Sequence, residues 1–178
     1  ALGSGEVTLL ELCNAYATIA AGGLKADPYN VFKVEDSDGK LLRKSQPGIQ
    51  EVLNEADCYQ LTQILQGAVQ HGTCWRAKAL NRPVAAKTGT TDNYTNAWFI
   101  GYVPDLVVGV WVGFDMNVSM GHGETGSRAA GPIFVDFMKE ALAGEPVKMF
   151  EKPMGLKDFR ICHETGYLAG ENCPVVVK

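Results

Sequence analysis

The chain of 178 residues carries 16 lysines and arginines against 20 acidic residues, which gives a formal net charge of −4. Hydrophobic residues make up 46% and charged residues 20%, as in a folded soluble domain and unlike a disordered chain. The acidic balance, without a basic cluster, argues against nucleic-acid binding. The longest apolar run, 106–114, is far shorter than the about 20 residues that a membrane helix needs.

Two helices are predicted in the first half of the chain. Thr8 and Glu11 form a capping-box pattern ahead of apolar residues at helical spacing, and the glycine pair 22–23 ends this helix. Asn54 is in a position to cap a second helix, which Gly72 ends.

Strands are predicted in two places. A hairpin joins 31–35 to 41–43, because the turn between them contains the Asp-Gly pair typical of tight turns. Three further strands follow one another at 84–88, 97–102 and 106–114. Their short connections make neighbours antiparallel. The last two are apolar nearly throughout, so we expect both of their faces to be covered.

A third helix is expected after the glycine-rich loop 117–127. It starts near Ala129, has Pro132 in its first turn, and ends at Gly144. The elements together predict an α+β fold, an antiparallel sheet flanked by helices from both ends of the sequence. We expect residues 1–144 to form this unit and 145–178 to be an irregular C-terminal extension with one small hairpin.

The segment with the clearest chemical content is Lys-Thr-Gly-Thr-Thr at 87–91, at the end of a predicted strand. The Lys87 ammonium supplies positive charge, and the hydroxyls of Thr88 and Thr90 supply hydrogen-bond donors. Gly89 removes a side chain, so that a ligand backbone is able to approach. This combination suits a bound carboxylate. A phosphate loop is excluded, because the full Gly-rich pattern of such loops is absent.

Several runs, taken together and in order, resemble the transpeptidase domain of the bifunctional class A penicillin-binding proteins. Lys-Thr-Gly is one signature of the penicillin-recognising serine enzymes. The other runs are Leu-Gly-Ser-Gly-Glu-Val-Thr at 2–8, Ala-Trp-Phe-Ile-Gly-Tyr at 97–102, Val-Trp-Val-Gly-Phe-Asp at 110–115, Gly-Ser-Arg-Ala-Ala-Gly-Pro-Ile at 126–133 and Glu-Thr-Gly-Tyr-Leu-Ala at 164–169. The resemblance covers essentially the whole chain and implies an incomplete penicillin-binding or β-lactamase-like fold.

The resemblance implies a peptidoglycan D,D-transpeptidase, which cross-links stem peptides through a serine acyl-enzyme and is inhibited by β-lactams. On the matching positions, Lys87 would attract the substrate carboxylate and orient the second motif. Thr88 and Thr90 would bind that carboxylate beside Gly89, and the Thr90 backbone N–H would be one of two oxyanion donors. No metal or organic cofactor is implied.

The family's nucleophile motif has no convincing counterpart in this chain. The only Ser-x-x-Lys match, 37–40, falls in the predicted hairpin turn, so we interpret it as a chance match. Tyr94-Thr95-Asn96 follows Lys-Thr-Gly instead of preceding it, and we expect a loop that connects strands there. We therefore expect the chain to be the C-terminal part of a transpeptidase domain, inactive alone and with apolar surface left exposed.

The resemblance also implies what the missing part would supply. The N-terminal part of the same protein would provide the nucleophile, a glycosyltransferase region and a membrane anchor. The parent would then lie at the periplasmic, or extracytoplasmic, face of the inner membrane. The loop 117–127, with Glu124 and Arg128, is a candidate for the rim of the cleft.

Three positions depart from the family pattern. Ala86 and Cys74 stand where glycine is usual, and Asn96 replaces a common aspartate. Cys74 is either a reactive thiol near the cleft or a packing residue, and packing is the expected role. Cys162 and Cys173 flank a loop and are able to pair as a disulfide in an oxidising compartment. A metal site of Cys162, His163 and Cys173 is less well supported, because no second ligand pair has zinc-type spacing.

Two alternatives remain open at this stage. One is another serine acyltransferase of the same superfamily, a β-lactamase or a D,D-carboxypeptidase. The other is a non-catalytic module that senses β-lactams or binds peptidoglycan. Upstream sequence would separate the three hypotheses. A glycosyltransferase region with an anchor would support the transpeptidase, a cleavable signal the β-lactamase or carboxypeptidase, and a cytoplasmic signalling region the non-catalytic module.

Overall fold

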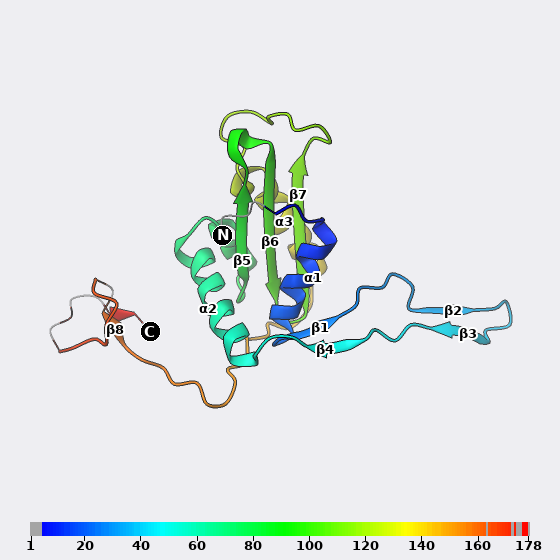
Figure 1. Cartoon of the computed structure of the whole chain (residues 1–178), viewed down its shortest axis with the longest axis horizontal. Coiled ribbons are helices and arrows are strands. Elements are labelled where there is room, and N and C mark those ends of the chain that lie inside the picture. The colour runs from blue at the N-terminus through cyan, green and yellow to red at the C-terminus, as the bar shows by residue number, and fades with distance from the viewer. Residues whose placement is uncertain (1–4, 163, 172, 174–175, 178) are drawn as a thin grey trace.

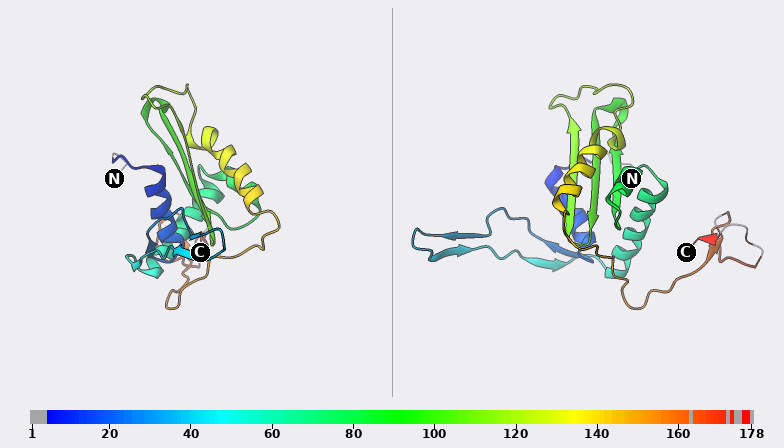
Figure 2. Two further views of the ribbon diagram at one scale, coloured as in Figure 1. Left: turned by 90° about the vertical axis from the view of Figure 1, so that its right-hand side faces the viewer. Right: turned by 180° about the vertical axis from the view of Figure 1, so that it is seen from behind.

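The computed structural model describes residues 5–162, 164–171, 173 and 176–177. Its body has three layers, with a three-stranded sheet between two helical layers (Figure 1). Helices α1 (Leu9–Ala20) and α2 (Glu55–His71) cover one face, and α3 (Gly131–Ala141) covers the other (Figure 2). The predicted α+β arrangement is confirmed.

The sheet is an antiparallel meander of β5 (Ala85–Thr90), β6 (Asn96–Val103) and β7 (Leu106–Gly113), in that order. Lys87 lies opposite Ile100, and Ile100 lies opposite Gly109. The expected covering on both faces is correct for β6, which is almost entirely buried, and also for β7, which packs against hydrophobic clusters on both sides but is only half-buried. The reason is position, because β6 lies between two strands and β7 lies at an edge.

Both N-terminal helices begin as the sequence predicts. The Thr8 hydroxyl accepts from the Glu11 N–H, and the Glu11 carboxylate accepts from the Thr8 N–H, which completes the capping box. The Asn54 side chain accepts from the Ala56 N–H at the start of α2. Each helix buries one face on the sheet and leaves the other exposed.

The third helix starts differently from the prediction. A π-helical turn, η3 (Gly126–Ala130), comes first, and α3 follows it with Pro132 in its first turn. The helix ends at Ala141, before the expected Gly144. Phe134 and Met138 are fully buried and pack with Phe99 from β6 in the larger hydrophobic core. This core, to which α2 contributes Val69, and η3 hold the central strand on the side of the sheet that α3 covers.

Two short ladders extend away from the body (Figure 1). The predicted hairpin is β2 (Lys33–Glu35) with β3 (Leu41–Lys44), paired around the turn at Gly39. At its base β1 (Leu24–Ala26) pairs with β4 (Ile49–Glu51), a ladder that the sequence did not indicate. In β1 and β4 only Ala26 is half-buried and the other residues are exposed, so these strands do not show the alternation of buried and exposed residues by which a strand is predicted.

The C-terminal segment lies on the side of the body away from the β2–β3 hairpin (Figure 1). It forms the small predicted hairpin, β8 (Ile161–Cys162) with β9 (Val176–Val177). A short 3₁₀ helix, η1 (Trp75–Leu80), links α2 to β5. None of the helices among the described residues is long and apolar enough to cross a membrane.

Apolar surface stays exposed on the outer helical layer, as expected for part of a domain. Leu10 on α1 is 61% exposed and Ile64 on α2 is 69% exposed. Both values are far above those of the core residues, and such surface is normally covered in a complete domain.

Candidate functional site

The candidate site is the edge strand β5, which carries Lys87, Thr88, Gly89 and Thr90 in one run. β5 is hydrogen-bonded to β6 along one edge, and no other strand of the described residues pairs with its second edge. An edge of this kind presents backbone donors and acceptors that an extended peptide is able to pair with. All four predicted residues are therefore brought together along one accessible edge.

Lys87 is exposed, and its ammonium donates a hydrogen bond of 2.9 Å to the carbonyl oxygen of Thr88. The side chain is thus folded back along its own strand. Among the described residues, no carboxylate forms an ion pair with Lys87, so its charge remains available to an anion.

Thr88 is anchored by a residue that the sequence analysis missed. Its hydroxyl oxygen lies 2.6 Å from the hydroxyl oxygen of Thr73, in the loop between α2 and η1. A hydroxyl both donates and accepts, so one of the two oxygens keeps a hydrogen for another partner. The pair Gly72-Thr73 resembles a family pattern that precedes the active-site strand, but no role was assigned to Thr73 from the sequence.

Thr90 is anchored by the segment that precedes α3. Its hydroxyl oxygen accepts a hydrogen bond of 3.0 Å from the backbone N–H of Gly126, the first residue of η3. A side chain at Gly126 has no room, because an added Cβ would lie 2.2 Å from the Trp98 carbonyl oxygen and 2.7 Å from that of Gly89. Glycine is therefore required where η3 crosses the strands.

Cys74 lies directly behind the strand and is fully buried. Burial raises the pKa of its thiol, while hydrogen bonds from Thr73 and the Thr88 backbone and the charge of Lys87 act in the opposite direction. Since a buried thiol with a raised pKa is a poor nucleophile, the structure supports the packing role.

The departure at Ala86 is accommodated by its neighbour across the sheet. Ala86 lies opposite Gly101, and a Cβ on Gly101 would approach the Ala86 methyl to 2.9 Å and Phe134 to 2.7 Å. The extra methyl therefore fills space that Gly101 leaves, beneath Phe134. The departure at position 96 is structural too, because the Asn96 side chain accepts from the Trp111 indole N–H at 2.8 Å.

The loop after β7 reaches the same end of the sheet as Thr90. The Met120 N–H donates to the Tyr94 carbonyl oxygen at 3.0 Å, and the His122 and Tyr94 rings lie 5.4 Å apart. Arg128 and Glu124 form an ion pair of 3.5 Å within this region. Tyr94 has a left-handed backbone conformation (φ 56°), unusual for a bulky residue.

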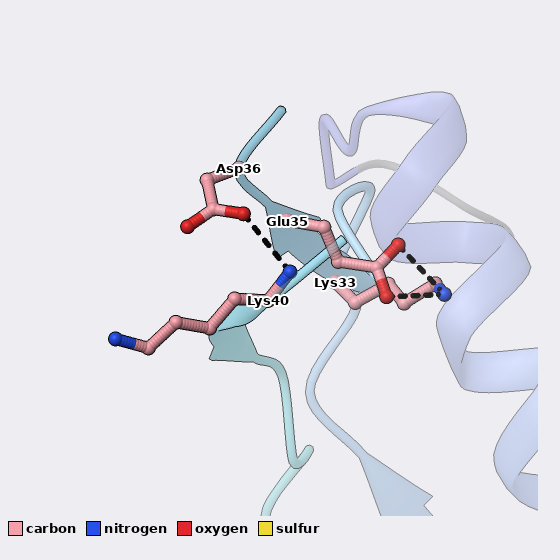
Figure 3. Close-up of polar contacts among 4 residues, drawn as sticks. All are labelled: Lys33, Glu35, Asp36 and Lys40. Atoms are coloured by element: carbon pink, nitrogen blue, oxygen red, sulfur yellow. Dashed lines mark hydrogen bonds and ion pairs between the residues drawn. The ribbon is translucent and has the colours of Figure 1, made fainter. Parts of the chain in front are cut away.

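The Ser-x-x-Lys match lies far from this end, in the exposed turn of the β2–β3 hairpin (Figures 1 and 3). The Asp36 carboxylate accepts from the backbone N–H of Lys40, which closes the turn, and Lys33 pairs with Glu35. The Lys40 side chain extends away from these contacts (Figure 3). The interpretation of this match as accidental is supported.

In the C-terminal hairpin, the Cys162 thiol is hydrogen-bonded to the Cys173 side chain. Within the part of the chain that the structure describes, no group of three or more His, Cys, Asp or Glu residues is placed to hold a metal ion. His163, the third member of the metal site considered from the sequence, lies outside the described residues.

Comparison with known proteins agrees with this geometry. Residues 1–139 match the model of the penicillin-binding protein transpeptidase domain. Penicillin-binding protein 1A of Aquifex aeolicus is 40% identical over 173 residues, which is 97% of this chain and 24% of the relative.

Solved structures give the same result. Penicillin-binding protein 1A from Haemophilus influenzae has a TM-score of 0.88 at 27% identity, covering 94% of this chain and 31% of that one. Penicillin-binding protein A from M. tuberculosis, as a ceftriaxone acyl-enzyme complex, has a TM-score of 0.66 at 25% identity, with 76% and 32% coverage. The chain spans about a quarter of the curated relative and about a third of the two structures. It is a partial transpeptidase domain, and it belongs to the penicillin-binding protein transpeptidase domain family.

Proposed function

We propose that this chain forms the substrate-carboxylate side of a peptidoglycan D,D-transpeptidase. The observation that carries the proposal is the edge strand β5, on which Lys87, Thr88 and Thr90 lie in sequence with both hydroxyls held from outside the strand. Membership of the family supports the reaction class, and the nucleophilic serine would come from a part of the parent outside this chain.

The side chains of the motif have the following roles in the proposal. Lys87 attracts the terminal carboxylate of a stem peptide or of a β-lactam, because its ammonium has no carboxylate partner among the described ion pairs. Thr90 donates its hydroxyl hydrogen to that carboxylate, since its oxygen is already occupied as an acceptor for Gly126. Thr88 does the same if the hydrogen between the two threonines belongs to Thr73, and the proposal includes this assignment.

The acyl transfer needs an oxyanion site as well as a carboxylate site. The Thr90 backbone N–H is assigned as one of its two donors, which lowers the energy of the tetrahedral intermediate. Gly89 keeps the strand free of a side chain between the two threonines. Residues 1–144 would be the catalytic unit and 145–178 its extension. The parent would be anchored to the membrane by a segment outside this chain and would face the periplasm.

The test is intact and peptide-level mass spectrometry after β-lactam treatment, on this chain and on the longer protein that contains it. We expect a stable adduct on a serine of the longer protein outside this chain, and no adduct on this chain alone. An adduct at Ser37 would contradict the assignment of the nucleophile. A folded longer protein without any adduct would favour a non-catalytic binding module instead.

A further inference from the structure

The C-terminal hairpin is held together by very little besides backbone hydrogen bonds. The Cys162 N–H donates to the Tyr167 carbonyl oxygen at 2.8 Å, and the Ala169 N–H donates to that of Arg160 at 2.8 Å. Strands β8 and β9 have two residues each. Ladders this short are marginal in water without a hydrophobic face to bury.

The described side chains around this hairpin do not supply such a face. Phe159, Tyr167 and Leu168 are 55%, 78% and 66% exposed. Among the described residues of the segment 156–171, only Cys162 is buried. Small elements without a core usually depend on a covalent cross-link or a metal.

The two cysteine side chains of this segment are placed to form such a cross-link. The Cys162 thiol is hydrogen-bonded to the Cys173 side chain, so the two side chains already meet across the loop. We propose that Cys162 and Cys173 form a reversible disulfide that closes the C-terminal hairpin. This inference does not depend on the transpeptidase function.

The surroundings of Cys162 favour its reactive form. Hydrogen bonds from Cys173, from the Thr165 side chain and backbone, and from the Glu164 backbone lower the pKa of the Cys162 thiol to about 7. Near neutral pH a large fraction of this group is therefore thiolate, the form that carries out disulfide exchange. Burial instead raises the pKa of Cys58 and Cys74, and also of half-buried Cys13, so these thiols are less reactive.

The oxidation needs a disulfide oxidant, either a low-molecular-weight disulfide or a thiol–disulfide oxidoreductase. The Cys162 thiolate attacks one sulfur of the oxidant, whose disulfide bond breaks and releases one thiolate. Cys173, after losing its proton, then attacks the Cys162 sulfur of the mixed disulfide and releases the second thiolate. The two protons of the cysteines end on the two released thiols, so two protein thiols are oxidised and one disulfide is reduced.

The experiment uses the 178-residue chain without removal of any segment, equilibrated in a glutathione redox buffer, acid-quenched and alkylated with iodoacetamide. Trypsin places both cysteines in the peptide 161–178, because no lysine or arginine lies between them. We expect this peptide to be lighter by two hydrogens and to take up no alkyl group. A protease specific for glutamate cuts after Glu164 and Glu171, between the two cysteines, so only a disulfide keeps the products joined.

Two variants and one further readout complete the test. Cys173→Ser should restore alkylation, or glutathione addition, at Cys162, whereas the matched control Cys58→Ser should leave the cross-link intact. Hydrogen exchange at the Cys162 and Ala169 amides should slow by about tenfold or more on oxidation, because the cross-link restrains the open hairpin. Full alkylation of both cysteines in the oxidising buffer, a disulfide from Cys162 to Cys13, Cys58 or Cys74, or a zinc ion retained by the two thiols in native mass spectra would overturn the proposal.

Discussion

The hydroxyl oxygens of Thr73 and Thr88 lie 2.6 Å apart, which ties the loop after α2 to the middle of β5. The Thr90 hydroxyl is held by the Gly126 N–H at the start of η3. The two hydroxyls assigned to the substrate carboxylate are thus positioned by two different parts of the chain before any ligand binds. Such preorganisation lowers the cost of orienting groups in the reaction.

Replacing Thr73 with valine keeps the shape of the side chain and removes its hydroxyl. We expect β-lactam acylation of the longer protein to slow by about threefold to tenfold, because one hydrogen bond to Thr88 is lost. Stopped-flow or gel-based acylation kinetics measure this rate. Thr73→Ser retains the hydroxyl and should acylate close to the wild-type rate. Equal rates for the valine variant and the wild type would exclude a positioning role for Thr73.

Lys87→Ala removes the ammonium assigned to the carboxylate. Acylation should fall by about a hundredfold or more, the scale found when one preorganised electrostatic contact is removed from an active site. The thermal midpoint should hardly change, since Lys87 is exposed and its ammonium is hydrogen-bonded to the next residue of its own strand. Lys25→Ala, an exposed lysine on β1, is the matched control and should leave acylation unchanged. A Lys87→Ala protein that acylates normally would contradict the assigned role.

Gly126→Ala should destabilise the domain by about 1–3 kcal/mol, because the methyl group collides with backbone oxygens of Trp98 and Gly89. Gly67→Ala is a control of opposite sign. Gly67 lies inside α2 with nothing within 4 Å of an added Cβ, so alanine should stabilise by about 0.5–1 kcal/mol. Urea unfolding of both variants measures these differences. Equal stability of the two variants would show that η3 does not pack against β5 and β6 as described.

The buried tyrosine of β6 gives a prediction in pH. Burial raises the pKa of Tyr102 to about 12, despite the 2.8 Å hydrogen bond to Thr62, which acts to lower it. In the unfolded chain the pKa is about 10. The folded protein therefore favours neutral Tyr102, a contribution that is complete below pH 10 and is lost as the pH rises through 12.

Tyr102→Phe makes this contribution visible. Below about pH 9 the variant should be less stable by about 1 kcal/mol, because the hydrogen bond to Thr62 is lost. Above about pH 11 the order should reverse, since wild-type stability falls by about 2 kcal/mol and that of the variant does not fall for this reason. Unfolding free energies across this range test it, with exposed Tyr167→Phe as the control. A constant difference between wild type and variant would refute the prediction.

Much of the fold could be predicted from the sequence because its signals are local. The capping box of Thr8 and Glu11, the Asn54 cap and the Asp-Gly turn each depend on a few neighbouring residues. The β1–β4 ladder was missed because it pairs residues such as Ala26 and Ile49, far apart in the sequence and with little burial. The π-helical start of α3 is set by packing against Trp98, which no local pattern shows.

The residues of the candidate site also differ in whether they could be predicted from the sequence. Lys87, Thr88, Gly89 and Thr90 form a contiguous motif, so reading along the chain was enough to find them. Thr73 and Gly126 lie 15 and 36 residues from their partners and act through single hydrogen bonds. Residues that position others in this way become visible only when the chain is folded.

The meander of β5, β6 and β7 has a consequence for how the domain folds. All of its strand pairs join neighbours in the sequence, through the segment between Thr90 and Asn96 and the turn between Val103 and Leu106. Closing loops this short costs little chain entropy, whereas α1 meets the sheet where Cys13 approaches Gly109, across most of the described chain. We therefore expect the meander to assemble first and α1 to dock afterwards. Substitutions at the Ile100–Gly109 pairing should slow folding, and substitutions on α1 should chiefly accelerate unfolding.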